Sequence, residues 1–403
     1  MQNNQKIPEG WSVKKLGDIC HINKFSLSEK TSKDYKFKYI DLSSVDEGKI
    51  EFPTEDISFG EAPSRARRKI NKNDIIMSTV RPNLKGFAFI DFDSTNFICS
   101  TGFAVLTAKE HAYNRYIYQL LYSKNIETQI NNMLVGSNYP AINSSDVASL
   151  KFAIPPLAEQ EKIAGILGTW DEVIEKLSSL IEQKKLLKKG LMQRLLTGKT
   201  RLKGFTQPWK EVKLGEVLFE HSQKSCENEA VCSVSVHKGV VNQVEHLGRS
   251  FSAANTSNYN LVHYGDVIYT KSPTGDFPYG IFKQSQQKNN VIVSPLYGVF
   301  TPKSYALGYI LDSYFSYPVN MNNYLKPIIQ KGAKNTINIT NKTFLSKSLC
   351  LPTNIAEQKA ISDVLSTADE EIDLLNKKLE ALKEQKKGLM QQLLTGQIRV
   401  KVN

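Results

Sequence analysis

Apolar residues recur with a mean spacing of 3.5 residues over two long stretches, one in the middle of the chain and one at its end. This spacing is the heptad seam of a coiled coil, so each stretch predicts one long helix that needs an apolar partner. The first seam contains two lysines, Lys184 and Lys188, and the second is broken only at Lys386. The seam residues are Ile163, Leu167, Trp170, Ile174, Leu177, Ile181, Leu191 and Leu195 in the first stretch, and Ile361, Leu365, Ala368, Ile372, Leu375, Leu379, Leu382, Leu389 and Leu393 in the second.

Helix-stopping residues bound both stretches. Pro155 and Pro156 precede the first and Pro352 precedes the second, and both end in Leu-Leu-Thr-Gly, at Gly198 and Gly396. Glycine favours the left-handed conformation that terminates a helix. About 34 residues per helix span about 50 Å. The simplest partner for each helix is the other, in an antiparallel pair, because the chain returns through a second domain between them. Packing of each helix on its own domain is the alternative.

The two helical stretches are copies of each other. With an offset of 198 residues, residues 158–203 match residues 356–401 at 24 of 46 positions without a gap. The same offset aligns Trp11 with Trp209. A fixed-period repeat dictates the architecture, and two copies predict a pseudo-twofold molecule suited to a target with two halves.

Each helix follows about 150 residues of mixed pattern. Short alternating or β-branched runs predict strands, and amphipathic runs predict helices at Tyr113–Asn131 and Gly308–Leu325, which together indicate an α/β (α+β) fold. The predicted strands are Phe37–Asp41, Asp74–Val80, Phe103–Thr107, Ala230–Val236, Asp266–Thr270 and Tyr297–Thr301. We therefore expect four segments: a first mixed domain at 1–153, a helical spacer at 154–203, a second mixed domain at 204–350 and a second spacer at 351–403.

Composition narrows the class of protein. Hydrophobic residues make up 40% and charged residues 23% of 403 residues, as in soluble globular proteins. The sequence contains no run of 18 apolar residues and no secretion signal at its start, so we expect a cytoplasmic protein. Its five cysteines form no C-x-x-C pair and are expected to be free thiols. A net charge of +12 favours a polyanionic partner, although a merely soluble basic protein would also fit.

Motifs for catalysis and cofactor binding are absent. Gly198-Lys199-Thr200 resembles the end of a P-loop, but Gln193 stands where that motif needs glycine and the tripeptide follows a helix. Pro155-Pro156 lies between Ile154 and Leu157, so it is not the Asn/Asp-Pro-Pro-aromatic loop of amino-methyltransferases. The six histidines are scattered and form no metal-binding or catalytic pattern. We expect no catalytic residue, no metal and no cofactor in this chain.

Basic, amide and hydroxyl side chains do gather at comparable places in the two copies. Arginine pairs with guanine edges or phosphates, and asparagine suits adenine edges. A solvated basic loop is the alternative for any single residue. The predicted DNA-binding residues are Arg65, Arg67, Arg68, Lys69, Ser78, Thr79, Arg81 and Asn83 in the first copy, and Arg249, Lys271, Ser272, Thr274, Tyr279 and Lys283 in the second.

The end of the first predicted helix is also basic, because residues 182–203 contain eight lysines and arginines and a single acid, Glu182. This face is a solvated helix surface, a stripe that faces DNA, or a docking surface for an acidic partner, and the sequence does not decide among them. Lys184 and Lys188 in the seam either fray the coiled coil or mark a docking site.

The full chain resembles the specificity (S) subunits of type I restriction-modification systems. The matching segments are IPEGWSVKKLGDI (7–19), NDIIMSTVRP (73–82), IPPLAEQEKI (154–163), QPWKEVKLGEV (207–217), GDVIYTKSP (265–273), LPTNIAEQKAI (351–361) and the paired LMQxLLTG helix ends.

This resemblance implies two target-recognition domains that each read one half of a bipartite DNA site, separated by an antiparallel coiled coil that sets the gap. It implies two adenine-methyltransferase (M) subunits docked on the helices, and two ATP-dependent restriction (R) subunits in the complete nuclease. S-adenosylmethionine, ATP and Mg²⁺ are then expected on those partners. Because aligning Asp74 with Asp266 needs an offset of 192, the mixed domains diverge more than the helices, which predicts a non-palindromic site. An enzyme with degenerate motifs and a coiled-coil scaffold that never touches DNA are the competing hypotheses.

Overall fold

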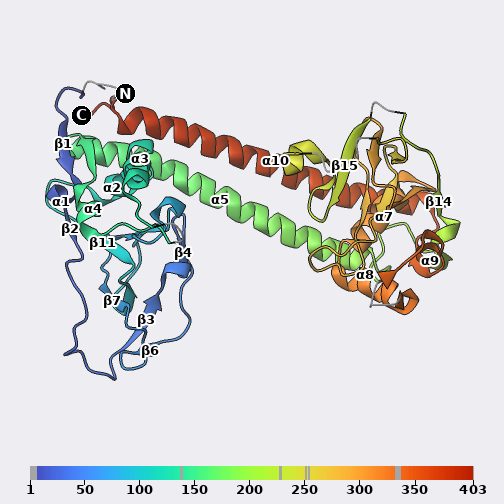
Figure 1. Cartoon of the computed structure of the whole chain (residues 1–403), viewed down its shortest axis with the longest axis horizontal. Helices are drawn as coiled ribbons and strands as arrows, with labels where there is room; N and C mark the ends of the chain where they lie inside the picture. Colours follow the sequence, from blue (N-terminus) through green and yellow to red (C-terminus); the bar gives the residue numbers. More distant parts are fainter. Residues whose placement is uncertain are drawn as a thin grey trace. The chain divides into compact units, whose positions relative to one another are not determined.

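The chain divides into two compact units, each built from a mixed domain and part of both long helices (Figure 1). The computed structural model describes residues 7–136, 139–226, 229–249, 252, 255–331 and 337–402. Unit 1 comprises residues 1–178 with 377–403, and unit 2 comprises residues 179–376. The last 27 residues of the chain thus fold with its first domain. The four-segment division at 153, 203 and 350 stays a prediction.

Unit 1 contains two four-stranded sheets. The first has the order β2 (Cys20–Ile22), β11 (Phe103–Ala108), β8 (Ile75–Ser78) and β9 (Phe87–Phe89), all antiparallel. The second has the order β6 (Ile57–Ser58), β3 (Lys36–Ile40), β10 (Phe97–Ser100) and β7 (Ala66–Lys69), in which β3 and β10 are parallel. Two further antiparallel pairs join β1 (Ser12–Lys15) to β12 (Lys151–Ile154) and β4 (Val45–Asp46) to β5 (Lys49–Ile50).

The strand β8 is buried on both faces, which explains its uninterrupted apolar sequence. Ile75 and Met77 point into the main core of unit 1, while Ile76, between them, joins a second cluster with Ile40 and Cys99. This is the two-residue period of a strand covered on both sides. The main core also receives residues from both long helices, so the mixed domain and the helix pair share one hydrophobic core.

The helix predicted at Tyr113–Asn131 is wrong as a single element. It is two helices, α2 (Asn114–Leu121) and α3 (Lys124–Met133), because the Ser123 side chain accepts a hydrogen bond from the backbone N–H of Ile126 and starts a new helix. Serine at such a position competes with helix continuation. The short helices of unit 1 are α1 (Leu16–Ile19), η1 (Leu42–Ser44), η2 (Pro82–Leu84) and α4 (Ser144–Ser149).

Unit 2 repeats this plan. One sheet has the order β14 (Leu218–Glu220), β21 (Gly298–Pro302), β18 (Val267–Tyr269) and β19 (Phe282–Gln284). The other has the order β16 (Gly239–Asn242), β15 (Ala230–Ser235), β20 (Val291–Val293) and β17 (Asn260–Val262). The ribbon of β13 (Lys210–Lys213) and β24 (Ser348–Leu351) matches β1 and β12, and β22 (Gln330–Lys331) pairs with β23 (Ile337–Asn338). The six strands predicted from the sequence are confirmed in substance as β3, β8, β11, β15, β18 and β21.

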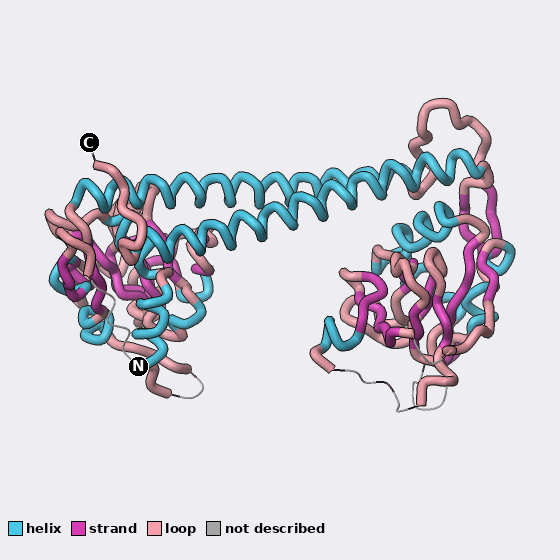
Figure 2. Tube along the Cα trace, turned by 90° about the horizontal axis from the view of Figure 1, so that it is seen from above, coloured by secondary structure: helices cyan, strands magenta, loops and turns pink. Residues whose placement is uncertain are grey.

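The helix predicted at Gly308–Leu325 is likewise two helices, α7 (Tyr305–Phe315) and α8 (Pro318–Leu325). Pro318 lacks a backbone N–H and is placed at the first turn of α8, where that donor is not needed. In each unit the short helices and strands lie beside segments of the long helices (Figure 2). The remaining short helices are η3 (Leu214–Glu216), α6 (Gln243–Leu247), η4 (Lys326–Ile328) and α9 (Asn341–Leu345).

The two long helices pack against each other in antiparallel fashion, as predicted. They are α5 (Leu157–Leu195, 39 residues) and α10 (Ile355–Leu394, 40 residues). In unit 1 the end of α10, at Leu393, shares a core with the start of α5, at Ile163. In unit 2 the end of α5, at Leu195, shares a core with the start of α10, at Ile361. The glycines Gly198 and Gly396 beyond the helices have φ of +67° and +70°, the left-handed conformation expected of them.

A search of the described residues finds no helix long and apolar enough to cross a membrane.

Candidate nucleic-acid interface and helix pairing

The first basic cluster lies along β7, at the edge of the second sheet of unit 1. Arg65 precedes the strand and is exposed, and the Arg67 guanidinium lies 4.5 Å from the centre of the Phe59 ring. Arg68 is half-buried, and its Nη1 donates to Ser26 Oγ at 3.1 Å. The pairing of β7 with β10 shifts register between Arg68 and Ala66, so regular strand alternation does not hold along the cluster. Arg65 and Lys69 are exposed, whereas Arg67 and Arg68 are half-buried and each contact another side chain.

A strained turn follows β8. Arg81 has φ of +49°, in the left-handed region that non-glycine residues rarely adopt, and its side chain is exposed. The backbone N–H of Arg81 donates to Pro140 O at 2.7 Å, which holds the turn in place. Ser78 is buried and its hydroxyl donates to Val80 O, while Thr79 Oγ1 donates to Gly102 O at 2.8 Å. These two hydroxyls shape the turn, whereas Arg81 and the exposed Asn83 are presented by it.

Sequence reasoning missed the neighbours of Arg81. Its guanidinium lies 4.4 Å from the centre of the Tyr139 ring, which is 69% exposed. Leu84, in η2, is 60% exposed. A cation and an aromatic ring thus stand together at the surface of unit 1, and an exposed aliphatic residue lies three positions after Arg81 along the chain. The only signal for Tyr139 in the sequence was a lone aromatic residue among Gly, Ser, Asn and Pro at 136–140.

Unit 2 has a strained basic turn at the equivalent strand exit. Lys271 follows β18 with φ of +60°. Burial lowers the pKa of Lys271, and the nearby carboxylate of Glu220 partly offsets that effect. The exposed Ser272 and Thr274 continue the loop, in which the backbone groups of Thr274 and Phe277 pair with each other.

The remaining predicted DNA-binding residues of unit 2 differ in the exposure of their side chains and in the contacts that they make. Lys283 Nζ is 3.1 Å from Asp312 Oδ1 and its side chain is only 13% exposed, so this cation is already paired. Tyr279 is half-buried, and its backbone carbonyl accepts a hydrogen bond from Tyr269. Arg249 is exposed just after α6. Of this set, Lys271, Ser272, Thr274 and Tyr279 lie on the loop between β18 and β19, whereas Lys283 lies in β19 and Arg249 follows α6.

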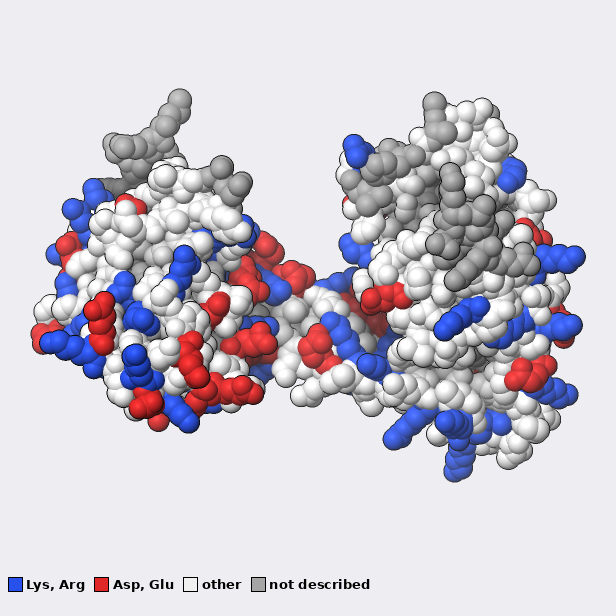
Figure 3. Space-filling model, turned by 60° about the horizontal axis from the view of Figure 1, so that its bottom comes forward, with Lys and Arg blue, Asp and Glu red and all other residues white. Residues whose placement is uncertain are grey.

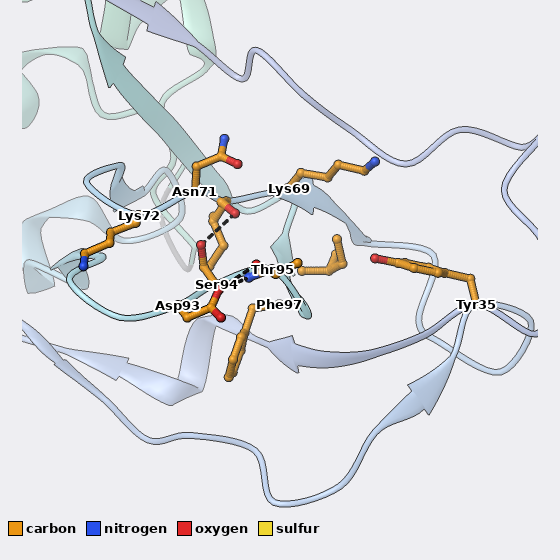
Figure 4. Close-up of a pocket in the computed structure, with 10 residues that line it drawn as sticks. Tyr35, Lys69, Asn71, Lys72, Asp93, Ser94, Thr95 and Phe97 are labelled. Atoms are coloured by element: carbon orange, nitrogen blue, oxygen red, sulfur yellow. Dashed lines mark hydrogen bonds between the residues drawn. The ribbon is translucent and has the colours of Figure 1, made fainter.

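A pocket of about 360 Å³ lies beside Lys69 in unit 1 (Figure 4). Lys69 and Lys72 extend from its rim, and Ser94 Oγ donates to Ile70 O at 3.0 Å in its wall. Hydrogen bonds from Thr95 hold the pKa of Asp93 below its usual value, so this carboxylate is ionised at neutral pH. The pocket is therefore a polar hollow of mixed charge beside the basic strand. On the face shown in Figure 3, acidic and basic side chains are mixed over unit 1, whereas basic ones prevail along one edge of unit 2.

Each long helix begins with a buried glutamate that accepts hydrogen bonds from residues of both copies of the repeat. Glu159 accepts hydrogen bonds from Trp11 Nε1 at 3.2 Å and from Arg399 at 2.7 and 2.8 Å. In unit 2 the same contacts run from Trp209 and Arg201 to Glu357, at 3.2 Å and at 2.6 and 2.7 Å. Arginine and carboxylate form the two parallel bonds of a bidentate pair. All six residues are identical between the copies at the 198-residue offset, which was the signal present in the sequence.

The seam lysines are paired with acids of the opposite helix. Lys184 Nζ is 2.6 Å from Glu371 Oε1, and Lys188 pairs with Asp369, both within unit 2. In unit 1, Lys386 Nζ lies 2.5 Å from Asp171 Oδ1. The sequence left two interpretations of Lys184 and Lys188, fraying of the coiled coil or a docking site. Because both lysines pair with acids of α10, the helices are held together at these positions and do not fray there. Polar residues in an apolar seam fix its register.

The predicted seam residues are buried or half-buried, and those near the helix ends also pack against the mixed domains. Leu177, Leu379, Ile163, Leu167, Leu195, Ile361, Leu365 and Leu393 are buried, and Trp170, Ile174, Leu191, Ile372, Leu375, Leu382 and Leu389 are half-buried. Several apolar residues outside the seam are exposed on the same helices, among them Leu186 at 68% and Leu374 at 65%. Single exposed apolar residues are common on protein surfaces and do not by themselves mark a docking site.

The duplicated fold defines a class of protein with two copies of one mixed domain joined by a helix pair, and the sequence comparison identifies that domain. The sequence profile of the type I restriction modification DNA specificity domain matches residues 8–184 and again residues 206–384. The chain therefore belongs to this family and is a type I restriction-modification specificity subunit with two such domains.

Relatives match over nearly the whole chain. The type I restriction enzyme MjaVIII specificity subunit of Methanocaldococcus jannaschii is 26% identical, covering 98% of this chain and 95% of its own length. The EcoKI specificity subunit of Escherichia coli K12 is 23% identical over 86% of this chain and 80% of its own. The crystal structure of the type I restriction-modification S subunit from M. genitalium shares the fold, with a TM-score of 0.60, 16% identity and 98% coverage of both chains.

Proposed function

We propose that the two strained basic turns are the DNA-reading elements of this specificity subunit. The observation that supports this proposal is that equivalent strands of the two units both lead into a turn with a basic residue at positive φ: Arg81, three residues after β8, and Lys271, two residues after β18. Strained backbone persists where the surroundings over-determine it, and functional sites often have this property. One turn presents Arg81 with Tyr139, and the other presents Lys271 with serine and threonine hydroxyls. Because these sets differ, the two half-sites should differ in sequence.

The helix pair then sets the distance between the half-sites. A 39-residue helix is about 58 Å long, and one turn of DNA is about 34 Å, so the two lengths are of the same order. The paired Lys–Asp contacts at both ends of the seam hold the register and with it the spacing. The DNA site is therefore bipartite, with a gap of defined length.

Chemistry belongs to partner subunits in this proposal. The chain itself is non-catalytic and acts in the cytoplasm, where it directs adenine methylation by two M subunits and cleavage by two R subunits. S-adenosylmethionine, ATP and Mg²⁺ bind to those partners.

A methylation map tests this function directly. Adenine methylation is mapped across the genome of a strain with the matching M subunit, with and without this gene. Loss of one gapped, two-part motif is the expected result. If the map does not change, binding of DNA by the chain co-purified with M is measured, and absence of sequence-specific binding would contradict the proposal. Turnover of S-adenosylmethionine or DNA by the chain alone, with Mg²⁺, would contradict its non-catalytic role.

A further inference from the structure

Two histidines and a buried aspartate come together in unit 2, outside the DNA-reading turn. Asp266 Oδ2 is 3.0 Å from His221 Nε2 and 3.1 Å from His263 Nδ1. Among the described residues, these three form the one group of His, Cys, Asp and Glu side chains that could hold a metal ion, with all ligand atoms within 4.8 Å of one another. No local sequence pattern marks this group, because 42 residues separate His221 from His263 and only folding unites them.

The duplication provides an internal control for what the fold requires of this aspartate. In unit 1, Asp74 occupies the same place before the central strand: it accepts from Thr107 Oγ1 at 2.6 Å and from the Asn71 backbone N–H at 2.8 Å. Asp266 repeats both bonds, with Thr301 Oγ1 at 2.7 Å and the His263 backbone N–H at 2.8 Å. The carboxylate therefore has its structural role in both copies.

The histidines have no counterpart in unit 1. Strand pairing aligns His221, just after β14, with Asn23, just after β2, and aligns His263 with Asn71. Unit 1 thus builds the same turn with two asparagines. The two imidazoles of unit 2 are additional to what the turn needs, and both reach the same carboxylate oxygen.

Geometry and chemistry fit a transition-metal ion. With metal–ligand bonds of about 2.0–2.1 Å, neighbouring ligand atoms of a tetrahedral site lie about 3.3 Å apart, close to the two distances observed. Imidazole nitrogens with one carboxylate suit Zn²⁺, Co²⁺ or Ni²⁺, whereas Mg²⁺ prefers oxygen ligands. Asp266 is 2% exposed, His221 16% and His263 37%, so the site opens to solvent on the His263 side. His221 Nδ1 is buried without a hydrogen-bond partner in the described structure, so the hydrogen bonds of this ring run through Nε2 alone, and the ring also packs 5.4 Å from that of His263.

We propose that His221, His263 and Asp266 form a binding site for a divalent transition-metal ion such as Zn²⁺. The site has three protein ligands and completes its coordination with water. The metal joins the end of β14 to the turn between β17 and β18, and so braces the sheet from which the Lys271 turn projects. This role is separate from DNA recognition and from the Mg²⁺ chemistry expected of the partner subunits.

Cobalt titration of the full chain, co-purified with M and freed of metal by EDTA, tests the proposal. Tetrahedral Co²⁺ gives intense visible absorption, and we expect saturation at one ion per chain, displacement by Zn²⁺ and no displacement by excess Mg²⁺. Thermal unfolding should shift upward when Zn²⁺ is added.

Two variants carry the residues found in unit 1, and one matched control lies nearby. His221→Asn and His263→Asn should each weaken Co²⁺ binding at least tenfold and abolish the thermal shift, with the circular dichroism spectrum unchanged. His237→Asn removes an exposed histidine of the same unit and should change neither. Binding that persists in both test variants, a thiolate charge-transfer band that places the ion on a cysteine, or no binding by the parent chain would each overturn the proposal. The methylation map remains an independent test of DNA specificity, so failure of one does not imply failure of the other.

Discussion

Lys188 of α5 pairs with Asp369 of α10. The 198-residue offset of the repeat relates this pair to a second one, in which Lys386 of α10 pairs with Asp171 of α5. Lys188 belongs to the first copy and Asp369 to the second, and the second pair exchanges these origins. The repeat thus folds on itself so that each copy completes the other. At these seam positions an apolar residue could pack in several registers of the two helices. A Lys–Asp pair forms in one register only, so the lysines specify how the helices are aligned.

We expect the Lys188–Asp369 pair to show measurable coupling. In a double-mutant cycle with Lys188→Met and Asp369→Asn, monitored by urea unfolding, the coupling free energy should be about 0.5–1 kcal/mol, discounted for the partial exposure of Asp369. The exposed pair Lys185–Glu182 on α5 serves as the control and should give a smaller value. Equal coupling in the two cycles would show that the seam pair has no special role in register.

Shortening both helices together should shorten the gap between the half-sites. Residues 175–181 and 376–382 lie between the two Lys–Asp pairs, so deleting both segments keeps the pairs and the heptad phase. Each helix loses about 10 Å, equivalent to about 3 base pairs of DNA. The methylated motif should keep both half-sites with a gap shorter by that amount. Deleting only 175–181 displaces one helix against the other, and we expect it to abolish methylation; an unchanged gap in the double deletion would refute the spacing role.

Arg81 and Lys271 should act on separate half-sites. Arg81→Ala or Tyr139→Ala should cost about 1–3 kcal/mol of binding or relax specificity in one half-site only, because truncating a side chain on one turn leaves the other turn free to read its own bases. Lys271→Ala should affect the opposite half. Binding to an oligonucleotide set randomised in one half at a time measures both effects, with Lys30→Ala, an exposed cation of unit 1, as control. Equal weakening in both halves would mark either residue as structural.

The turn before β8 should become less stable as the pH rises. Burial raises the pKa of Asp74 above its usual value, and hydrogen bonds from Thr107 and Asn71 offset this only in part. The folded state therefore binds the proton more tightly than the unfolded state, and this contribution to stability is present below about pH 4 and is lost as the pH rises through the raised pKa. Asp74→Asn removes the titration, so its melting temperature relative to the parent chain should increase between pH 4 and 7. Asp91→Asn, which removes an exposed carboxylate just after β9, should show no such trend.

Native alkylation should distinguish the five cysteines, all of which are free thiols as expected. Burial raises the pKa of Cys20 to about 12 and that of Cys232 to about 11, and it also raises that of Cys99. These thiols should remain unmodified by iodoacetamide at pH 8, because the thiolate is the reactive form. Exposed Cys226 should react first, and Cys350 more slowly because its pKa is raised. Mass spectrometry with and without denaturant measures the order, and early labelling of Cys20 would contradict the packing of unit 1.

The sequence by itself determined the duplication, the two long helices with their antiparallel partnership, and the central strands. These features follow from the spacing of apolar residues and from identities at one fixed offset, both of which can be read from the sequence without knowledge of the tertiary structure. It also determined the location of the basic turn around Arg81, because Ser-Thr-Val-Arg-Pro-Asn follows a strand pattern. Ser123 and Pro318 are residues that commonly begin a helix, so the sequence contained a signal for both breaks. The apolar pattern continues across them, however, and each pair of helices was therefore predicted as one longer helix.

Only the tertiary structure decided which polar groups meet. Lys188 finds Asp369, Glu159 finds Arg399, and Arg81 lies over Tyr139 because distant segments are brought together by a shared core, and no local period encodes these encounters. The same is true of His221, which follows β14, and of His263 and Asp266, which lie in the turn between β17 and β18. Tertiary packing also gave Arg68 a hydrogen bond to Ser26, and Lys283 an ion pair with Asp312. Side-chain direction and partner choice depend on packing in three dimensions, and that is the physical reason they could not be deduced from residue types and spacing.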